Sequence, residues 1–289
     1  MMNREKDFLI VGLGLLGGAY AKALKKKGYY VMAIDINEDS IEYALENNII
    51  DEGAVSGHEL IEKADVIISG LYPKTMVQWI MDNQQYFKSG VVITDVSGVK
   101  SGIVDKVQEN LREDAEFISS HPMAGREVSG VRNSDEKIFE VANFIVTPTE
   151  KNTPQGIEFA KQLGAVLGFK NITELSLKEH DKMIGFVSQL THVIAVSLMN
   201  TNDNTHLVEY TGDSFRDLTR IAKINEVLWS ELFLLNKEIL VEEIDAFAKE
   251  LLNFREKLVN EDVEEMKKLF IQSTARRKLF DKCDVKNKK

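Results

Sequence analysis

The chain contains little cysteine and proline, and it has no excess of positive charge. Its 289 residues include 1 cysteine, 4 prolines and 18 glycines. The single cysteine, Cys283, excludes a disulfide framework within the chain and is typical of a reducing compartment. The low proline and glycine content excludes collagen-like and proline-rich disordered proteins.

Charge and hydrophobicity exclude further classes of protein. The formal net charge of −10 disfavours nucleic acids and anionic membrane surfaces as partners, because both are polyanions. The longest apolar runs reach only about half a membrane span, and the N-terminus MMNREKDF is too short and polar for a signal peptide. We therefore expect a cytoplasmic protein that acts on a small molecule.

In the first half of the chain, short β-rich runs alternate with amphipathic segments, as in a parallel sheet covered by helices. The six candidate strands are Phe8–Val11, Tyr29–Ile34, Val66–Ser69, Val91–Thr94, Glu116–Ser119 and Phe144–Thr147. Helices are expected over Leu15–Lys27, from an Asn37 cap through Leu45, after Pro73, and around Ile103–Leu111. We predict an α/β Rossmann-type domain, a doubly wound parallel sheet, over residues 1–170.

After about residue 173 the strand signals end. Apolar residues at three- and four-residue spacing then predict helices over Leu175–Asn200, Asp213–Lys223, Glu226–Leu251 and Glu261–Phe280. We predict an all-α C-terminal domain over residues 171–289. Its long helices carry many apolar positions, which favours a homodimer.

A glycine-rich turn follows the first strand, in G12-L-G14-L-L-G17-G18, and leads into a helix. In this context Gly12 permits a tight turn, Gly14 lets the backbone approach a pyrophosphate, and Gly17 allows close packing of helix and strand. Asp35 ends the second strand, where an acidic residue binds the adenosine ribose and repels a 2′-phosphate, which favours NAD over NADP. The predicted cofactor-binding residues are Gly12, Leu13, Gly14, Leu15, Leu16, Gly17, Asp35 and Ser97.

Among the five histidines, His121 has the most informative position, in S120-H-P-M-A-G125 after a candidate strand. The carboxyl ends of strands border the ligand crevice of an open α/β sheet. A neutral imidazole there can accept the proton of a substrate hydroxyl while the same carbon loses hydride. A loop histidine that caps a strand end is the alternative that these residues leave open.

The helix expected around residues 181–192 carries a polar stripe. Asp181, Gly185, Ser188 and His192 follow one another at spacings of 4, 3 and 4 residues, which places them on one helical face. Such a stripe on an otherwise apolar helix lines a cleft or faces solvent, and the spacing does not decide between the two.

A second set of charges lies in the segment from residue 215 to residue 223. If this segment is helical, Arg216, Arg220 and Lys223 share a face at spacings of 4 and 3 residues. Three cations there suit a dianionic substrate, because arginine binds carboxylates with two hydrogen bonds. A solvated basic face is the alternative.

Several motifs together resemble the TyrA family of prephenate and arogenate dehydrogenases. They are D95-V-S-G-V-K100, H121-P-M-A-G-R-E127-V-S-G130, F144-I-V-T-P-T149, E179-H-D-K-M-I-G-F-V-S188, F215-R-D-L-T-R-I-A-K223 and Trp229. The resemblance covers nearly the whole chain and implies NAD-dependent oxidative decarboxylation of prephenate to 4-hydroxyphenylpyruvate, in tyrosine biosynthesis.

The resemblance also implies roles for individual residues. His121 matches the catalytic histidine, which removes the proton of the ring hydroxyl, and Arg220 matches the arginine that holds a substrate carboxylate. Glu127 matches an acidic residue at the pocket mouth that is linked to gating. We expect no metal. The predicted catalytic residues are His121 and Ser97, and the predicted substrate-binding residues are Arg220, Glu127, Ser188, His192 and Lys223.

The chain departs from the family pattern at two positions. Many relatives have a serine where this chain has Gly98, and Ser97 lies one place earlier, so its hydroxyl either replaces that serine or does not reach. Some relatives have a second pocket histidine where this chain has Gln189. We expect a monofunctional enzyme, because no residues remain for a chorismate mutase or an ACT domain.

Three other functions remain open at this point. An arogenate dehydrogenase differs only in the side chain of its substrate. A β-hydroxyacid or 6-phosphogluconate dehydrogenase depends on a lysine in the first long helix of its second domain, and Lys182 is close to that place. A non-enzymatic NAD-binding sensor would need neither His121 nor Arg220.

Overall fold

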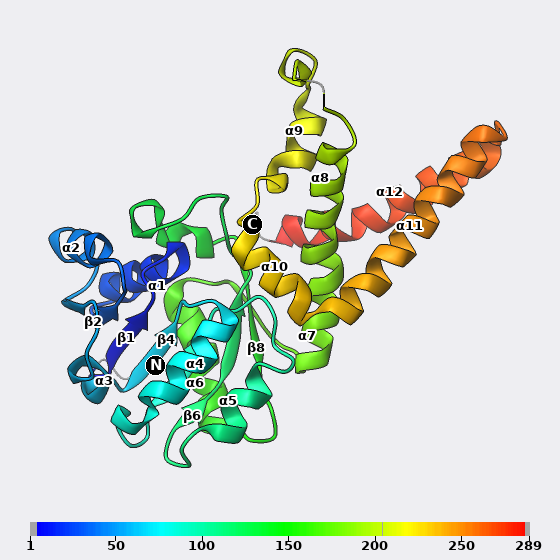
Figure 1. Cartoon of the computed structure of the whole chain (residues 1–289). Helices are drawn as coiled ribbons and strands as arrows, with labels where there is room; N and C mark the ends of the chain where they lie inside the picture. Colours follow the sequence, from blue (N-terminus) through cyan, green and yellow to red (C-terminus); the bar gives the residue numbers. More distant parts are fainter. Residues whose placement is uncertain (1–4, 204, 287–289) are drawn as a thin grey trace. The chain divides into compact units, whose positions relative to one another are not determined.

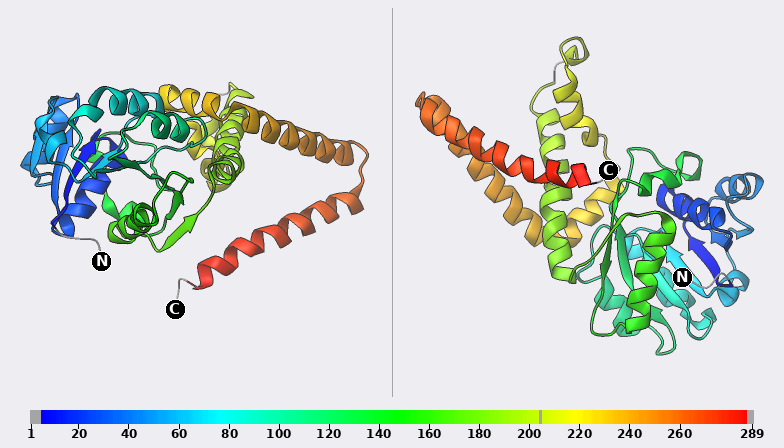
Figure 2. Two further views of the ribbon diagram at one scale, coloured as in Figure 1. Left: turned by 90° about the horizontal axis from the view of Figure 1, so that it is seen from below. Right: turned by 180° about the vertical axis from the view of Figure 1, so that it is seen from behind.

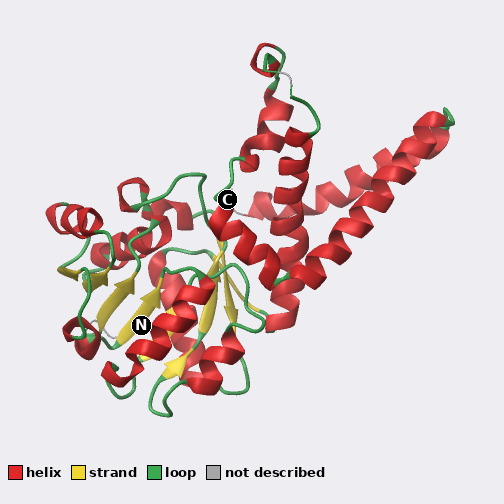
Figure 3. Cartoon of the chain, in the orientation of Figure 1, coloured by secondary structure: helices red, strands yellow, loops and turns green. Residues whose placement is uncertain are grey.

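The computed structural model describes residues 5–203 and 205–286. It separates into two compact units, Met1–Ile239 and Leu240–Lys289, which are described in turn. Within the described residues, all strands belong to the first unit (Figures 1 and 3).

The first unit contains a parallel sheet in the order β3-β2-β1-β4-β5-β6. Its strands are β1 (Asp7–Val11), β2 (Tyr30–Ile34), β3 (Glu52–Ala54), β4 (Val66–Ser69), β5 (Val92–Asp95) and β6 (Glu116–Phe117). The central strands are buried on both faces, which explains why they are nearly continuous apolar runs.

Helices cover both faces of this sheet, as predicted for a doubly wound fold. They are α1 (Leu15–Lys26), α2 (Glu38–Glu46), α3 (Glu59–Lys63), α4 (Pro73–Asn83), α5 (Val104–Asn110) and α6 (Pro154–Leu167). In β1, Phe8 and Ile10 pack in one core with α1, α2 and α6, whereas Leu9 and Val11 pack in a second core with α3, α4 and α5. This division follows from the two-residue period of a strand. The short 3₁₀ turns are η1 (Gln84–Tyr86), η2 (Val131–Asn133) and η3 (Glu136–Phe139).

A second sheet of three strands corrects two of the strand predictions. It consists of β7 (Ser119–Pro122), β8 (Asn143–Thr147) and β9 (Asn171–Glu174), with β7 antiparallel to β8 and β8 parallel to β9. The run Phe144–Thr147 therefore lies outside the parallel sheet. The parallel sheet still has six strands, because it includes the short edge strand β3, which was not predicted. The run Glu116–Ser119 is divided at Ile118 between two strands. Its first part is β6, which pairs with β5, and its last residue begins β7, which pairs with β8.

Helix α6 was not predicted, although its ends carry clear signals. The Thr153 side chain caps its first turn, Pro154 occupies its first position, and Gly168 ends it with φ at +102°. After it, β9 adds the residues just beyond 170 to the second sheet. The domain boundary at residue 170 stays a prediction.

The helical part of the first unit begins with one long helix, as predicted for Leu175–Asn200. It consists of α7 (Leu177–Ile184), the π-helical segment η4 (Gly185–Leu190) and α8 (Thr191–Asn200). The following elements are η5 (Leu207–Glu209), α9 (Asp213–Thr219), η6 (Arg220–Ala222) and α10 (Glu226–Leu235). The prediction of one helix over Glu226–Leu251 was wrong, because the chain breaks at Asn236, whose side chain hydrogen-bonds to the Asp181 carbonyl and to Gln189.

By length and hydropathy, Leu177–Asn200 could cross a membrane, which the apolar runs of the sequence did not indicate. Its buried side chains include His180, Asp181 and Gln189, and all three hydrogen-bond to other elements. Of the apolar window in this segment, 28% is buried within the structure, and the buried polar groups named here are all hydrogen-bonded.

The second unit begins within the first turn of α11 (Lys237–Val259) and contains the rest of that helix and α12 (Val263–Lys286), which are joined by a short turn (Figure 2). Glu261 in this turn has a positive φ of 53°. The rings of Phe254 and Phe270 lie 6.1 Å apart between the two helices.

Candidate active site

The glycine turn between β1 and α1 has the geometry that its sequence predicts. Gly12 has φ at +96° and donates its N–H to the Ile34 carbonyl at 2.8 Å. A Cβ at Gly17 would lie 2.0 Å from the Gly12 carbonyl oxygen, so only glycine fits there. A Cβ at Gly14 would meet nothing within 4 Å. The N-terminus of α1 therefore faces open space, with backbone N–H groups suited to a phosphate.

Asp35 follows β2 and is hydrogen-bonded to the glycine turn. One carboxylate oxygen accepts the Leu13 N–H at 2.6 Å, and the other accepts the Asn37 N–H at 2.8 Å. The Leu13 side chain is buried, and those of Leu15 and Leu16 are half-buried. These residues thus offer the backbone of the turn and one carboxylate, the groups expected to hold the pyrophosphate and the ribose of a dinucleotide.

Asp95 ends β5 and organises the strand that carries His121. Its buried carboxylate accepts the Ser119 hydroxyl at 2.7 Å, the Ser120 N–H at 3.0 Å and the Lys100 ammonium at 2.8 Å. Lys100 is fully buried and also donates to the Ser120 carbonyl at 2.7 Å. Burial raises the pKa of Asp95, but Lys100 and the Ser119 hydroxyl outweigh it, so the carboxyl stays ionised. The ion pair of Asp95 and Lys100 holds the start of β7 against the end of β5.

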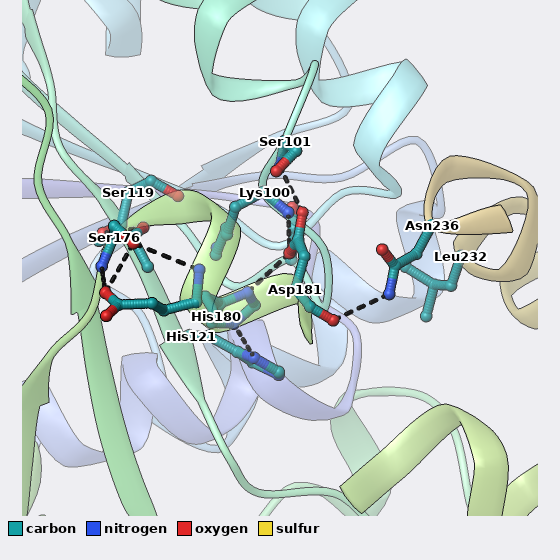
Figure 4. Close-up of polar contacts among 12 residues, drawn as sticks. Lys100, Ser101, Ser119, His121, Ser176, His180, Asp181, Leu232 and Asn236 are labelled. Carbon is teal, nitrogen blue, oxygen red and sulfur yellow. Dashed lines mark hydrogen bonds and ion pairs between the residues drawn. The ribbon is translucent and has the colours of Figure 1, made fainter. Parts of the chain in front are cut away.

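His121 lies within β7, opposite Ile145 of β8, rather than in a loop beyond the end of a strand. Its Nδ1 lies 2.9 Å from Nε2 of His180 (Figure 4). Burial, with His180 and Lys100 nearby, holds the pKa of His121 well below 6.5. His121 is therefore neutral at pH 7, as a general base requires. Within residues 5–203 and 205–286, its Nε2 has no hydrogen-bond partner.

His180, for which the sequence predicted no role, lies fully buried on α7. His180 Nδ1 lies 2.8 Å from Oδ1 of Asp181, and the Asp181 carboxylate also accepts the N–H groups of Lys100 at 2.9 Å and Ser101 at 2.6 Å. The available signal was the His-Asp pair in E179-H-D-K. It does not reveal that the histidine reaches His121, 59 residues earlier.

The predicted polar stripe runs through η4, which is π-helical, so each turn there contains an additional residue. The four residues of the stripe are all buried or partly buried. Asp181 and Gln189 are buried, whereas Ser188 and His192 are only partly buried. Gln189 donates to the Leu232 carbonyl at 2.9 Å and accepts from Asn236 at 2.7 Å, so it joins the long helix to α10.

A second polar cluster contains Glu127, His192 and Arg220. Arg220 forms an ion pair with Glu127, and the rings of His192 and Trp229 lie 3.7 Å apart. His192 Nδ1 donates to the Ser188 carbonyl at 2.9 Å. Burial is the main cause that lowers the pKa of His192 below 6.5. These four side chains come together from the loop after β7, from α8, from η6 and from α10.

Helix α10 connects this cluster to His121. A Cβ at Gly98 would lie 3.5 Å from a Leu232 methyl group and 4.0 Å from Cε1 of His121. Leu232 and Trp229 are three residues apart on α10 and so share a face. Gly98 therefore lies between His121 and the face of α10 that carries Trp229.

The shared basic face predicted for residues 216–223 is not formed, because α9 ends at Thr219 and η6 is a tighter 3₁₀ turn. Arg216 is exposed and pairs with Asp213, three residues before it. Lys223 is exposed at the end of η6. Arg220 is the member of the three that pairs with Glu127.

Ser97 is buried just after β5, and its hydroxyl has no hydrogen-bond partner among the described residues. His121 Nδ1 is instead engaged by His180. The space beside Gly98 can hold a serine side chain within van der Waals distance of Leu232 and His121. The proposed role of Ser97 stays a prediction.

Among the described residues, no group of three or more His, Cys, Asp or Glu side chains is placed to hold a metal ion.

Two family descriptions match consecutive parts of the chain. "Prephenate dehydrogenase, nucleotide-binding domain" matches residues 20–172, and "Prephenate dehydrogenase, dimerization domain" matches residues 176–272. The chain belongs to the prephenate dehydrogenase family. This confirms the resemblance to the TyrA family and the prediction of a nucleotide-binding domain followed by a helical domain.

Individual relatives agree with this family. The chain is 33% identical to the prephenate dehydrogenase of Bacillus subtilis, over 93% of this chain and 75% of the relative. It is 27% identical to the cyclohexadienyl dehydrogenase of Zymomonas mobilis, over 90% and 91%. It is also similar to the crystal structure of the Aquifex aeolicus prephenate dehydrogenase in complex with hydroxyphenyl propionate and NAD+. That similarity has a TM-score of 0.87 and 30% identity and covers 96% of this chain and 99% of the other.

Proposed function

We propose that this chain catalyses the oxidative decarboxylation of prephenate to 4-hydroxyphenylpyruvate, with reduction of NAD, as a step of tyrosine biosynthesis. The observation that carries the proposal is the position of His121, which is held through Nδ1 and has no described partner at Nε2. Membership of the prephenate dehydrogenase family supports the choice of substrate. NAD, when bound, accepts the hydride from the ring carbon that carries the hydroxyl.

The residues of the chain supply the remaining chemistry. His121 accepts the proton of the ring hydroxyl at Nε2 while hydride leaves the same carbon. The ring carboxylate leaves as CO2, and its bonding electrons make the ring aromatic. Arg220 binds a carboxylate of the substrate in place of Glu127, because its guanidinium can make two charge-assisted hydrogen bonds. His192, beside Trp229, Ser188 and Lys223 are proposed to complete the substrate site.

The cofactor preference follows from the geometry at the end of β2. The proposed cofactor-binding residues are Gly12, Leu13, Gly14, Leu15, Leu16, Gly17, Asp35 and Ser97. The open face at Gly14 suits a pyrophosphate, and the fixed Asp35 carboxylate suits a ribose 2′-hydroxyl but repels a 2′-phosphate. The residues present therefore fit NAD better than NADP.

A substrate and cofactor screen tests the proposal. Prephenate and arogenate are each supplied with NAD and with NADP, and reduced nicotinamide and CO2 are measured. We expect the highest kcat/KM with prephenate and NAD, and one CO2 released for each NADH formed. Faster turnover of arogenate would change the assigned substrate. Absence of turnover with both substrates, despite tight NAD binding, would support a non-enzymatic sensor.

We further propose that the chain forms a homodimer. The family describes its C-terminal domain as a dimerization domain. In the second unit, α11 and α12 expose apolar side chains of a kind that seldom stays in contact with water, among them Phe247, Leu251, Leu252, Phe270 and Ile271. Light scattering at micromolar concentration is expected to give twice the mass of the chain. The variant Phe270→Glu is expected to shift the protein toward monomer, and a monomeric wild type would contradict the proposal. The enzyme is expected to act in the cytoplasm.

A further inference from the structure

We propose that His180 and Asp181 act as positioning residues that fix the tautomer of His121, so that its Nε2 carries the lone pair that receives the substrate proton. This inference rests on the proposed function, since it explains how the proposed base is prepared. It starts from a continuous chain of hydrogen bonds between β7 and α7, which joins His121, His180 and Asp181 (Figure 4).

The chain of hydrogen bonds is anchored at Asp181, whose ionised carboxylate can only accept hydrogen bonds. It accepts two backbone N–H groups, from Lys100 and Ser101, and it lies 2.8 Å from His180 Nδ1. Burial alone raises the pKa of Asp181, but the hydrogen bonds from His180 and Ser101 outweigh it and keep the carboxyl ionised. Because Asp181 cannot donate, His180 must carry a proton on Nδ1.

The second step concerns the other nitrogen of His180. Burial holds the pKa of His180 below 6.5, so the ring is neutral at pH 7 and has one proton only. With that proton on Nδ1, Nε2 is an acceptor. Its neighbour at 2.9 Å is Nδ1 of His121, which must therefore donate. His180 is fully buried, so bulk water does not compete for either nitrogen.

The third step gives the state of His121. A neutral His121 with its proton on Nδ1 has its lone pair on Nε2, the nitrogen without a partner in residues 5–203 and 205–286. The charged groups that surround this chain of hydrogen bonds are Lys100, Asp95 and Asp181. Lys100 is paired with Asp95, so the Asp181 carboxylate is the group that offsets the positive charge of His121 after it takes the substrate proton. Without these hydrogen bonds, either tautomer of His121 would be available, and only one of them is a base toward the substrate.

Two substitutions of His180 separate this role from simple packing. In His180→Gln, the amide lies near the former Nε2 and can still accept from His121. In His180→Asn, the shorter amide lies near the former Nδ1 and keeps the contact with Asp181 but not the contact with His121. Partners that orient metal-binding histidines are typically worth about 10- to 100-fold, and we take the same range for His121. We expect His180→Asn to lower kcat by that factor with little change in KM, and His180→Gln to retain most of the activity.

The matched control is His58→Asn. His58 is exposed and stacks on Tyr86 with ring centroids 4.7 Å apart, and we have given it no role in the site. This variant is expected to keep wild-type kcat. Thermal unfolding and NAD binding are measured for all three variants to show that each is folded. Equal losses of kcat in His180→Gln and His180→Asn, or wild-type kcat in His180→Asn, would overturn the inference.

Nitrogen-15 NMR of histidine-labelled protein gives a readout that does not depend on turnover. The His121 resonances, assigned by their loss in His121→Asn, are expected to show the Nδ1–H tautomer in the wild type and a mixture of tautomers in His180→Asn. A wild-type His121 with its proton on Nε2 would overturn the inference, even if the enzyme is active. Failure of the wild type to turn over prephenate would instead contradict the proposed function, and the tautomer would still be measurable.

Discussion

His121→Asn is expected to lower kcat by about 100- to 10,000-fold, the usual contribution of a general base, with the fold retained. Asparagine keeps a polar group in β7, so Asp95 still holds Ser119 and Ser120, and the backbone pairing with Ile145 is unaffected. Its amide has no basic lone pair to receive the proton of the ring hydroxyl. Steady-state turnover of prephenate with NAD, followed at 340 nm, measures the loss.

The control for this variant is its affinity for NAD. The glycine turn and Asp35 lie at the ends of β1 and β2, so NAD binding should match that of the wild type. Thermal unfolding should also be close to that of the wild type. Wild-type turnover by a folded His121→Asn protein would exclude His121 as the base and leave the proposed mechanism without a proton acceptor.

The pH profile of the wild type provides a second check on the same residue. Burial lowers the pKa of His121 well below 6.5 in the folded protein, so the base stays deprotonated as the pH falls from 7 toward that value. The acid limb of kcat/KM should therefore have its midpoint below 6.5. A midpoint above 7 would show that His121 is stabilised in its charged form, contrary to its surroundings.

Local signals in the sequence were sufficient for the parts of the fold and site that depend on neighbouring residues. The strand, glycine turn and helix around Gly12 follow from backbone sterics, which act over a few residues. The Asn37 cap of α2 was predicted for the same reason, and its side chain accepts the Ser40 N–H. Family membership, as expressed in H121-P-M-A-G-R-E127, was recognisable because the motif is contiguous.

Features that depend on distant contacts could not be predicted in this way. The contact of His121 with His180 and the ion pair of Glu127 with Arg220 each join segments that only the folded chain brings together. The π-helical segment η4 alters the residue spacing within the polar stripe, and no pattern in the sequence marks it. Strand β3 has three half-buried residues around Gly53, so it lacks the apolar, β-branched run by which the other strands were found.

Arg220→Gln is expected to lower kcat/KM for prephenate by about 30- to 1,000-fold, mainly through KM. This range corresponds to the loss of about 2–4 kcal/mol when one partner is removed from a charge pair that the bound substrate buries. Glutamine keeps hydrogen-bonding capacity but loses the charge and the fork of N–H donors that match a carboxylate. The Arg220 guanidinium forms an ion pair with Glu127, so it is already directed at a carboxylate from the loop after β7.

Arg216→Gln is the matched control, because both arginines lie in one short segment and are similarly exposed. Arg216 pairs with Asp213 within its own helix, a contact of adjacent turns that any solvated helix can make. Arg220 reaches instead across 93 residues to Glu127. If a general positive field at this segment attracts the substrate, the two variants should lose kcat/KM equally, and the loss should shrink with added salt. If Arg220 binds a substrate carboxylate directly, Arg216→Gln should remain within a few-fold of wild type, and the large effect should belong to Arg220 alone.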